Sequence, residues 1–398
     1  MREKRLLVVT LPPLEGGVPA KTRILVEFLI RRGWSVTVAH YATLSDYPDL
    51  VAPSWRIPSG ARPRLRHGTC FDGVPSVAVG CWLPEVEATY YRPSRLWDEA
   101  IAGHDRHIAV GGTVLASYPL LKAGIAHLIW CASPMIDDRI DRRAGMSAPR
   151  RLFDRLVVAP LQARMEREIL AGPGLVMPVS AYAARGLAAL GRDPARIRPV
   201  PIPVDVVAYQ PPPEPPEPGV IGFAGRIGDP RKNVALLIEA VALAVRSGAD
   251  LRLEMTGTPD ATTSRLVTER GLGERVRFHG HVPRESLPDF YRRLDVFAIP
   301  SRQEGFGIVG IEAMACGVPV VSTRCGGPDD YVMPDETGYL VPHEPMPMAE
   351  RIMAIVADRP LRDRLSAAAR ALAVARYGHA RFEEAVSAAW SDVWGDAP

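Results

Sequence analysis

Residues 296–320 read VFAIPSRQEGFGIVGIEAMACGVPV, in which a glycine-rich loop joins a continuous apolar run to a short apolar helix. The apolar run is typical of a strand buried on both faces, because a half-exposed strand would alternate apolar and polar residues. Gly305 and Gly307 favour a tight loop, and residues 308–316 then read as a short helix that Gly317 ends. The stretch therefore predicts one strand–loop–helix unit of a parallel α/β sheet.

The same alternation of short apolar runs and amphipathic helical stretches extends through both halves of the chain. Strands that alternate with helices of about 10–15 residues indicate βαβ units and a parallel sheet. The predicted strands are 6–10, 35–39, 76–79, 107–110, 126–130 and 175–179 in the first half, and 220–224, 251–256, 276–279, 296–300, 318–322 and 338–341 in the second. The fold class predicted from this rhythm is α/β, with one parallel sheet in each half.

A proline-rich segment, YQPPPEPPEPG at 209–219, separates the two halves. Proline at this density cannot continue a helix or enter a central strand, so the segment is predicted to be a stiff linker. The predicted domains are 1–208 and 220–376, followed by a C-terminal helix at 377–398 that returns to the first domain. The length of 398 residues suits two such domains, each with its own core.

Composition narrows the classes of function. The net charge of +3 and the lack of an aromatic-rich basic stretch argue against nucleic acid as a partner. The five cysteines form no CxxC pair and no metal-ligand spacing. No apolar run reaches the roughly 18 residues of a membrane span, and the N-terminus does not continue as a signal peptide would, so a cytoplasmic location is predicted.

Two acids and two cations are the candidate chemical groups of the second half. Glu304 lies in the glycine-rich loop and Glu312 lies about one turn into the next helix, so that both can face one crevice. Arg226 and Lys232 follow the predicted strand 220–224 and suit a diphosphate. Spacing alone is equally consistent with structural roles. Glu304 would then be an acid that favours a helix start, Glu312 would form a surface ion pair, and the two cations would be solvated. That the chain contains only four lysines favours a functional role for Lys232.

With the segments around them, these residues resemble the donor-binding domain of the GT-B glycosyltransferase family 4, the group 1 retaining glycosyltransferases. The resemblance covers roughly residues 218–345 and is looser in the first half. The matching segments are Gly225-Arg226 with Lys232-Asn233, Thr256-Gly257, FHGHV at 278–282, Asp295 to Ser301, EGFG and EAMACG within 304–317, and Gly326-Gly327-Pro328. The resemblance implies a GT-B fold, in which two Rossmann-like domains with parallel sheets face each other across a cleft.

The resemblance also implies an activity, the transfer of a sugar from a UDP- or GDP-linked donor to an acceptor hydroxyl with retention of anomeric configuration. It implies that no metal or other cofactor is needed. Arg226, Lys232 and Glu304 are the implied catalytic residues: the two cations would hold the diphosphate and stabilise its charge as it leaves, and Glu304 would hold the donor sugar. The expected setting is bacterial polysaccharide, lipopolysaccharide or glycoconjugate biosynthesis.

Further donor-binding residues are implied by the same resemblance: Gly16, Gly17, His281, Val282, Phe306, Gly307, Ile308 and Glu312. Glu312 would bind the ribose hydroxyls, while the backbone of 306–308 would help to hold the sugar. The backbone near 281–282 would meet the base. The two glycines of the first domain would let its backbone approach the diphosphate or the acceptor closely.

The chain departs from the family pattern in the first half. Many members carry a histidine after the strand that corresponds to 128–130, where this chain has WCASP at 130–134. His104 and His107 are nearby candidates for its role, although a lone histidine is more often structural. The turn at 326–330 also carries aspartate where glutamate is frequent. The sequence does not identify the group that replaces the usual histidine.

The acceptor is not specified by the sequence, and saccharide, lipid-linked and small-molecule acceptors all remain open. Residues 139–167 mix arginine with apolar residues. Two interpretations are open for this segment, a solvated basic helix face and a peripheral contact with the anionic inner face of a membrane.

Several alternatives to glycosyl transfer remain open at this stage. A nucleotide-sugar 2-epimerase or hydrolase of the same fold would carry similar motifs, and a non-catalytic sugar-nucleotide binder is a further alternative. The stretch GGVPAKT at 16–22 resembles the P-loop of nucleotidases, but Glu15 and Ala20 stand where that motif needs glycine. The acidic pairs Asp137-Asp138 and Asp329-Asp330 are expected to have surface or capping roles rather than to bind a metal.

Overall fold

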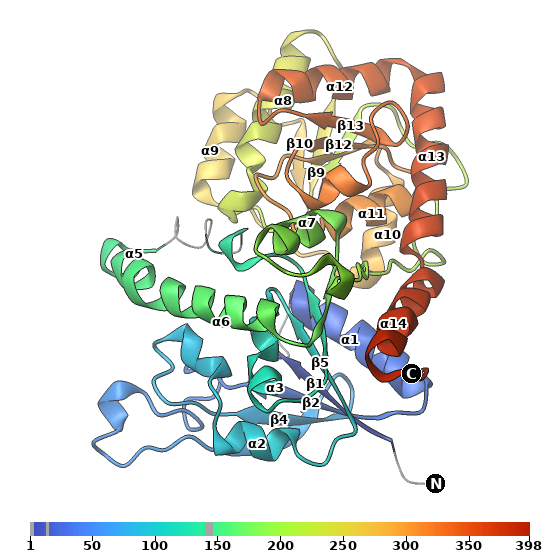
Figure 1. Ribbon diagram of the computed structural model, residues 1–398. Helices are drawn as coiled ribbons and strands as arrows, with labels where there is room; N and C mark the ends of the chain where they lie inside the picture. Colours follow the sequence, from blue (N-terminus) through green and yellow to red (C-terminus); the bar gives the residue numbers. More distant parts are fainter. Residues whose placement is uncertain (1–3, 13–15, 138, 140–145) are drawn as a thin grey trace. The chain divides into compact units, whose positions relative to one another are not determined.

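The computed structural model describes residues 4–12, 16–137, 139 and 146–398 (Figure 1). The chain forms two compact units, of which the first consists of Met1–Val200 and Glu383–Pro398 and the second of Pro201–Phe382. Each unit is built from strands that alternate with helices along the chain, as the apolar runs predict.

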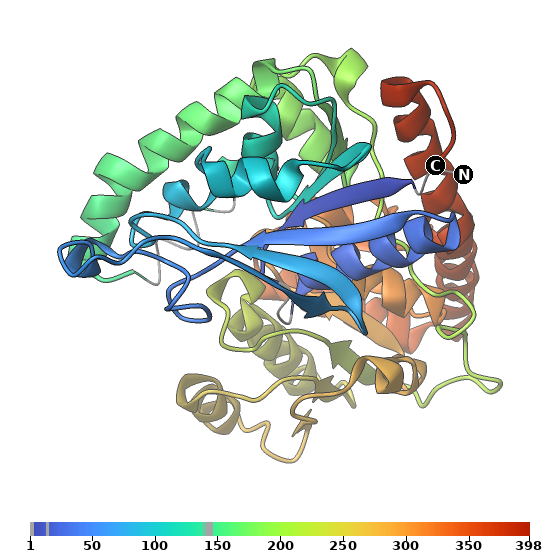
Figure 2. The ribbon, with the colours of Figure 1, turned by 90° about the horizontal axis from the view of Figure 1, so that it is seen from below.

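Among its described residues, the first unit contains a seven-stranded sheet in the order β3-β4-β2-β1-β5-β6-β7. The strands are β1 (Arg5–Thr10), β2 (Ser35–Tyr41), β3 (Leu65–Cys70), β4 (Val74–Val79), β5 (Arg106–Gly111), β6 (Leu128–Cys131) and β7 (Leu175–Pro178). Neighbouring strands are parallel except for β3, which runs antiparallel to β4. Figure 2 shows β1 and β2 side by side in blue.

Helices cover both faces of this sheet. They are α1 (Gly17–Arg31), α2 (Arg95–Ile101), α3 (Tyr118–Lys122), α5 (Ala148–Phe153), α6 (Ala159–Ala171), α7 (Ala181–Ala189) and the later part of α14 (His379–Trp394). Leu7 and Val9 of β1 belong to the core that α2 and α6 cover. On α14, Glu383 accepts a hydrogen bond of 2.9 Å from Arg31 of α1, and the two helices lie side by side in Figure 1.

Strand β3 was missed by the sequence analysis. Its residues, LRHGTC, are mostly exposed and polar, because β3 lies at the edge of the sheet and pairs only with β4. A tight turn joins the two strands, with Phe71 and Asp72 at positive φ and Gly73 after them. The Asp72-Gly73 pair is a hairpin signal that was available in the sequence.

The second unit, whose residues are all described, contains a six-stranded parallel sheet in the order β10-β9-β8-β11-β12-β13. The strands are β8 (Val220–Phe223), β9 (Arg252–Met255), β10 (Val276–Phe278), β11 (Val296–Ile299), β12 (Val320–Thr323) and β13 (Gly338–Val341). The predicted parallel sheet in each half of the chain is therefore confirmed.

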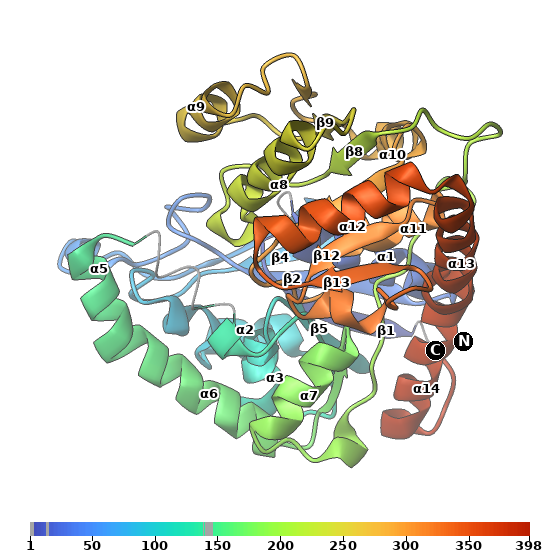
Figure 3. The same cartoon turned by 90° about the horizontal axis from the view of Figure 1, so that it is seen from above.

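The helices of the second unit pack on its buried strands. They are α8 (Val234–Arg246), α9 (Ala261–Glu269), α10 (Leu287–Arg292), α11 (Ile308–Ala315), α12 (Pro345–Ala357) and α13 (Arg359–Tyr377). Figure 3 shows α8 and α12 side by side, where their apolar residues share one core with Val296 and Val321 of the central strands. No helix in the described part of the chain is long and apolar enough to cross a bilayer.

The chain enters the second unit before the proline-rich segment. Val204 donates its backbone N–H to the carbonyl of Tyr377, at 2.7 Å. The guanidinium of Arg370 on α13 donates to the carbonyls of Val206 and Tyr209, at 2.9 and 2.6 Å. These bonds attach residues 201–208 to the second unit, whereas the sequence analysis assigned them to the first domain.

Candidate functional site

The candidate site of the second unit lies at the carboxyl ends of its parallel strands, where loops from neighbouring strands converge. Lys232 comes from the loop after β8, and Glu304 comes from the loop after β11. The Lys232 Nζ donates to Glu304 Oε1 at 2.6 Å, and the Ser301 hydroxyl donates to the same oxygen at 2.7 Å. The side chains of Lys232 and Glu304 are 18% and 12% exposed. The structure thus joins two of the three predicted catalytic residues in one ion pair.

Backbone hydrogen bonds hold the loop that carries Glu304. Its N–H donates to the carbonyl of Cys325, and its own carbonyl accepts from Gly327, both at 2.7 Å. Gly327 lies so close to this loop that a β-carbon there would come within 2.4 Å of the Phe306 Cα. The turn after β12 therefore fixes the position of Glu304, and glycine at 327 permits that approach.

Helix α11 starts directly beyond this loop. Gly307 precedes its first residue and has a φ of +73°, and its carbonyl accepts a hydrogen bond of 2.7 Å from the hydroxyl of Tyr331. The Phe306 ring is buried and packs against Tyr377, with ring centroids 5.8 Å apart. The predicted donor-binding backbone at 306–308 thus forms the helix start, where N–H groups without helical partners favour anionic and hydroxyl ligands.

Arg226, the third predicted catalytic residue, has a different partner. Its guanidinium donates to Asp229 at 2.9 Å, and its side chain is 77% exposed. Asp229 also accepts from Arg231, so it holds two guanidinium groups at the rim of the loop after β8. The structure therefore places Arg226 in an exposed ion pair, apart from the pair that Lys232 forms.

A pocket of about 490 Å³ brings Arg226 together with both predicted base-contacting residues, His281 and Val282. Two segments of its lining approach each other closely, since a β-carbon at Gly257 would lie 2.6 Å from the Gly225 carbonyl oxygen. The complete lining is Ala224, Gly225, Arg226, Ile227, Gly228, Thr256, Gly257, Thr258, Gly280, His281, Val282, Leu287 and Val309. Since the last of these residues belongs to α11, the pocket reaches the helix that carries Glu312.

Glu312 is buried inside the unit, and two tyrosines bind its carboxylate. Tyr291 donates to Oε2 at 2.9 Å, and Tyr209 donates to Oε1 at 3.4 Å. Burial raises the pKa of the Glu312 carboxyl to about 6, although these hydrogen bonds act in the opposite direction. Sequence reasoning missed both tyrosines. A ribose bound by Glu312 would compete with the long Tyr209 bond, so the ribose role stays a prediction.

In the first unit, the glycines predicted to approach a ligand lie at the start of α1. Gly16 has a φ of +133°, and a β-carbon built at either Gly16 or Gly17 would meet no atom of the described residues within 4 Å. The positive φ explains why glycine suits position 16.

Lys21, in contrast, is buried beneath the helix start. Its amine donates to the carbonyls of Gly111 and Trp130, at 2.8 and 3.1 Å, at the carboxyl ends of β5 and β6. Burial lowers the pKa of Lys21 to about 7. In a P-loop the lysine must reach a bound phosphate, whereas this amine is bonded to the backbone, so the nucleotidase alternative is not favoured.

The two candidate histidines of the first unit contact Ile101 near the amino end of β5. His104 and His107 both lie within hydrogen-bond distance of the Ile101 carbonyl, at 3.2 and 3.4 Å. Burial lowers the pKa of His107 to about 4. Gly111 and the start of α1 lie at the opposite, carboxyl edge of the sheet. The environment of these two histidines is therefore structural. The segment after β6 is instead fixed by Ala132 and Ser133, which donate to the Gly112 carbonyl.

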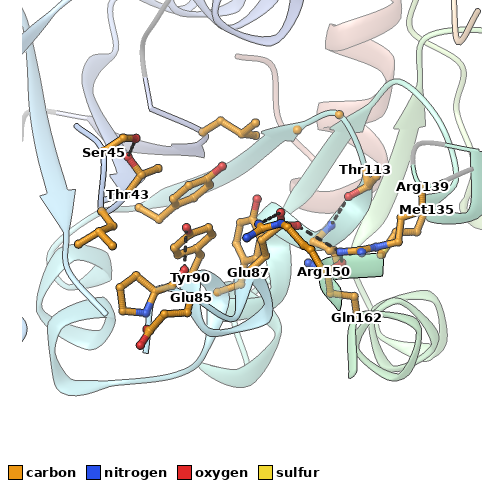
Figure 4. A pocket seen from close by; sticks show the side chains of 18 of the residues that line it. Thr43, Ser45, Glu85, Glu87, Tyr90, Thr113, Met135, Arg139, Arg150 and Gln162 are labelled. Atoms are coloured by element: carbon orange, nitrogen blue, oxygen red, sulfur yellow. Dashed lines mark hydrogen bonds and ion pairs between the residues drawn. The ribbon is translucent and has the colours of Figure 1, made fainter. Parts of the chain in front are cut away.

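A second pocket, of about 670 Å³, opens at the carboxyl ends of β1, β2 and β5 in the first unit (Figure 4). Tyr41 and Tyr90 stack within its lining, with ring centroids 4.5 Å and planes 3° apart. On the other side, Arg139 donates to Glu87 and Gln162, which also face the pocket. No motif in the sequence signalled this pocket, because its lining comes from eight separate stretches of chain.

The acidic pairs that were considered for metal binding have other partners. Asp329 accepts from the backbone N–H of Gly326 at 3.3 Å, and Asp137 accepts from the Tyr182 hydroxyl at 3.2 Å. Asp138 lies outside the described residues. Within the described ranges, no group of three or more His, Cys, Asp or Glu side chains has a geometry that could hold a metal ion.

Comparison with known proteins finds a family model and relatives that are named as glycosyltransferases. Residues 209–372 match the family model described as Glycosyl transferases group 1. The chain is 35% identical over 258 residues to a D-inositol 3-phosphate glycosyltransferase of Xylanimonas cellulosilytica, a match that covers 58% of this chain and 59% of the relative. A protein of the same name from Jonesia denitrificans is 36% identical over 202 residues, covering 45% and 47%. The chain thus spans about half the length of the curated relatives it matches.

Solved structures match nearly the whole chain. Sucrose-phosphate synthase from Thermosynechococcus elongatus has a TM-score of 0.72 at 20% identity, over 99% of this chain and 100% of that one. Anabaena HepE in complex with UDP has a TM-score of 0.71 at 16% identity, over 98% and 100%. The fold expected from the sequence is therefore confirmed at the level of each Rossmann-like unit. The chain has the fold of the GT-B glycosyltransferases, and its residues 209–372 are similar to the glycosyl transferases group 1 family model.

Proposed function

We propose that the chain is a retaining glycosyltransferase that moves a sugar from a nucleoside diphosphate to an acceptor hydroxyl. The observation that carries the proposal is the Lys232–Glu304 ion pair beside the start of α11, within the family-matched domain. A cation, a carboxylate and a helix start are the groups needed beside a sugar joined to a diphosphate.

The proposed chemistry uses these groups as fixed charges. When the sugar–phosphate bond breaks, negative charge grows on the diphosphate, and Lys232, Arg226 and the α11 start would stabilise it without reorganisation. Glu304 would hold the sugar hydroxyls, and the incoming hydroxyl would attack the face from which the diphosphate leaves. Because these cations neutralise the leaving group, the proposal includes no metal or other cofactor.

The donor and acceptor sites are assigned by the chemistry of their linings. The pocket with His281 and Val282 suits the base, since both residues follow β10 at the carboxyl edge. The structures of Anabaena HepE contain UDP and UDP-glucose, so UDP-linked sugars are the first donors to test. The first-unit pocket, with the stacked Tyr41 and Tyr90, suits an acceptor saccharide or cyclitol, because aromatic rings stack on the apolar faces of sugars.

A peripheral membrane contact is a further part of the proposal. In the described part of 139–167, four apolar side chains are 43–66% exposed: Leu152, Phe153, Leu156 and Leu161. Arg150 and Arg164 on the same stretch are 62% and 74% exposed, a combination that suits an anionic bilayer. Replacing Leu152 and Leu156 by Ser should abolish co-sedimentation with anionic vesicles; unchanged sedimentation would remove this contact from the proposal.

The proposed transfer is tested by acceptor-dependent release of nucleoside diphosphate. The full chain is incubated with UDP- or GDP-sugars, with and without saccharides, cyclitols and D-inositol 3-phosphate, and products are analysed by mass spectrometry. Transfer predicts a glycosylated acceptor with retained anomeric configuration. A free sugar without acceptor would indicate a hydrolase, and an epimerised sugar an epimerase.

A matched pair of variants ties that activity to the site. Glu304→Ala should lower transfer by about 10²-fold or more, since it removes a group held against the reacting sugar. Glu336→Ala, at an exposed acid of the same unit, should leave transfer unchanged. Equal activities of the two variants would contradict the proposed role of Glu304.

A further inference from the structure

The first unit contains another cavity, of about 500 Å³, that shares no lining residue with the proposed acceptor pocket. Its walls come from the residues after β4, from the segment that enters α2, and from the chain just before β3. Arg62, Arg92 and Arg95 line it together with Trp82, Leu83 and Leu96. No residue of this cavity takes part in the proposed sugar transfer.

The charge of the cavity is of one sign. Three of its lining residues are arginines and none of its described lining residues is acidic. The guanidinium groups of Arg62, Arg92 and Arg95 have no hydrogen-bond or ion-pair partner among the described residues. The acceptor pocket is different, because Arg139 and Arg150 there are both within 4.0 Å of Glu87. Three guanidinium groups around one cavity without a counter-charge favour the binding of an anion.

The rest of the lining is apolar, and backbone hydrogen bonds hold it in place. The side chains of Trp82 and Leu83 are 46% and 36% exposed. Leu83 has a φ of +55°, a strained conformation for leucine. It persists because Leu83 donates to the Ala52 carbonyl at 2.9 Å and accepts from the Thr89 hydroxyl at 3.0 Å. The exposed indole is therefore presented by a fixed turn beside the arginines.

We propose that this cavity binds a phosphorylated amphiphile, a molecule with a phosphate group and an apolar body. The planar forks of Arg92, Arg95 and Arg62 match phosphate oxygens in pairs. Trp82 and Leu96 would cover the apolar body, which removes exposed apolar surface from water. A lipid headgroup with its chain and a free phosphate ester both have this chemistry.

Calorimetry on the full chain separates the two parts of the ligand. The probes are decyl phosphate below its micelle concentration, inorganic phosphate and decanol. Decyl phosphate should bind at least about tenfold more tightly than either of the others, because only it fills both parts of the cavity. Its affinity should fall with rising salt, as expected for a charged contact. Equal binding of the three probes would overturn the proposal.

Variants locate the binding in this cavity. Arg92→Gln combined with Arg95→Gln should weaken decyl phosphate by about tenfold or more, whereas Trp82→Ala should weaken decyl phosphate but not inorganic phosphate. The charge-matched control is Arg265→Gln with Arg277→Gln, at exposed arginines of the second unit. An arginine variant that binds like its control would overturn the proposal.

Two further measurements are needed. One identifies the source of the ligand, and the other distinguishes failure of this site from failure of the proposed transfer. If the Arg92/Arg95 variant also loses binding to vesicles that contain phosphatidate, the source of the ligand is a membrane lipid. If the chain never binds these vesicles but still binds decyl phosphate, the source is a soluble phosphate ester. Either result supports the site. Transfer to a soluble acceptor should be unchanged in this variant, so that loss of the amphiphile site and failure of the proposed enzyme activity give different results.

Discussion

Lys21 and Lys232 occupy corresponding places in the two units, yet their environments are opposite. Each lies in the connection between two neighbouring parallel strands, β1 and β2 for Lys21 and β8 and β9 for Lys232. Lys21 is 1% exposed and bonds two backbone carbonyls, whereas Lys232 retains solvent contact and bonds a carboxylate. The connection between two parallel strands can therefore hold a structural lysine in one unit and, in the other, the lysine that is proposed to assist the transfer.

The difference comes from what surrounds each amine. The partners of Lys21 are neutral carbonyls deep in the unit, so burial opposes its charge and lowers its pKa to about 7. Lys232 has the Glu304 carboxylate beside it and remains accessible to a ligand. A cation can assist a leaving diphosphate only where a ligand can reach it, which distinguishes the second unit from the first.

The largest expected effect concerns the accessible lysine. Lys232→Ala should lower kcat/KM for sugar transfer by about 10²–10³-fold, because it removes a preorganised charge from the leaving group. The melting temperature should fall far less than the activity, because the Glu304 carboxylate keeps the hydrogen bond from Ser301 when its largely buried ion pair is broken. Steady-state kinetics and thermal unfolding measure the two effects. Lys122→Ala, which breaks the surface pair with Glu168, is the control. Unchanged turnover in Lys232→Ala would remove the contrast between the two lysines.

The buried lysine should give the reverse pattern. Lys21→Met should lower the free energy of unfolding by about 1–3 kcal/mol, because two buried carbonyls lose their donor, while affinity for nucleoside diphosphate should be unchanged. The pKa of Lys21 is about 7 in the folded chain against an ordinary 10.5, so the unfolded chain binds more protons between these values. The stability of wild type relative to Lys21→Met should therefore rise with pH above about 7.

Chemical denaturation at pH 7 and pH 8.5 tests that sign. Burial raises the pKa of the Cys131 thiol to about 12, and the charge of Lys21 acts in the opposite direction, so loss of Lys21 can only raise this pKa further. The folded thiol therefore stays protonated over this interval in both proteins. A stability difference that stays constant over this interval would show that the Lys21 amine stays charged when folded, and would contradict the lowered pKa. Loss of nucleoside diphosphate binding in Lys21→Met would show that this lysine belongs to the ligand site. That result would contradict its assignment as a structural lysine.

The smallest expected effect concerns Glu312, which extends the comparison to buried acids. Its pKa is raised to about 6 from 4.5, so the stabilisation of its protonated form is fully present below pH 4.5 and is lost as the pH rises through 6. A shift of this size corresponds to about 2 kcal/mol. Glu312→Gln, which cannot ionise, should thus gain up to that amount relative to wild type between pH 4 and pH 7. A pH-independent difference would mean that Tyr209 and Tyr291 fully offset the burial of the charge.

The family-matched half shows how much of the site was predictable. Gly305, Gly307 and Gly327 could be assigned to tight backbone because glycine tolerates conformations and approaches that a β-carbon prevents. The positions of Lys232 and Glu304 followed from their places after parallel strands. The ion pair between Arg226 and Asp229 was not predicted, although the two residues are only three apart. Whether such a pair forms depends on how it competes with solvation of the two charges, which sequence spacing does not reveal.

The sequence by itself determined the strands, their parallel pairing and the loops that carry the candidate groups. These features depend on patterns within about ten residues, such as a buried apolar run followed by glycine and an amphipathic helix. The edge strand β3 escaped this reasoning because its residues are polar and only its pairing with β4 stabilises it.

The tertiary structure alone decided which groups are buried and which are paired. Lys21 meets carbonyls 90 and 109 residues further along the chain, and Tyr209 meets Glu312 across 103 residues. Contacts at such separations depend on how elements pack, so no local pattern encodes them. For the same reason Arg62, Arg92 and Arg95 become a candidate site beside Trp82 only when the fold brings their separate segments together.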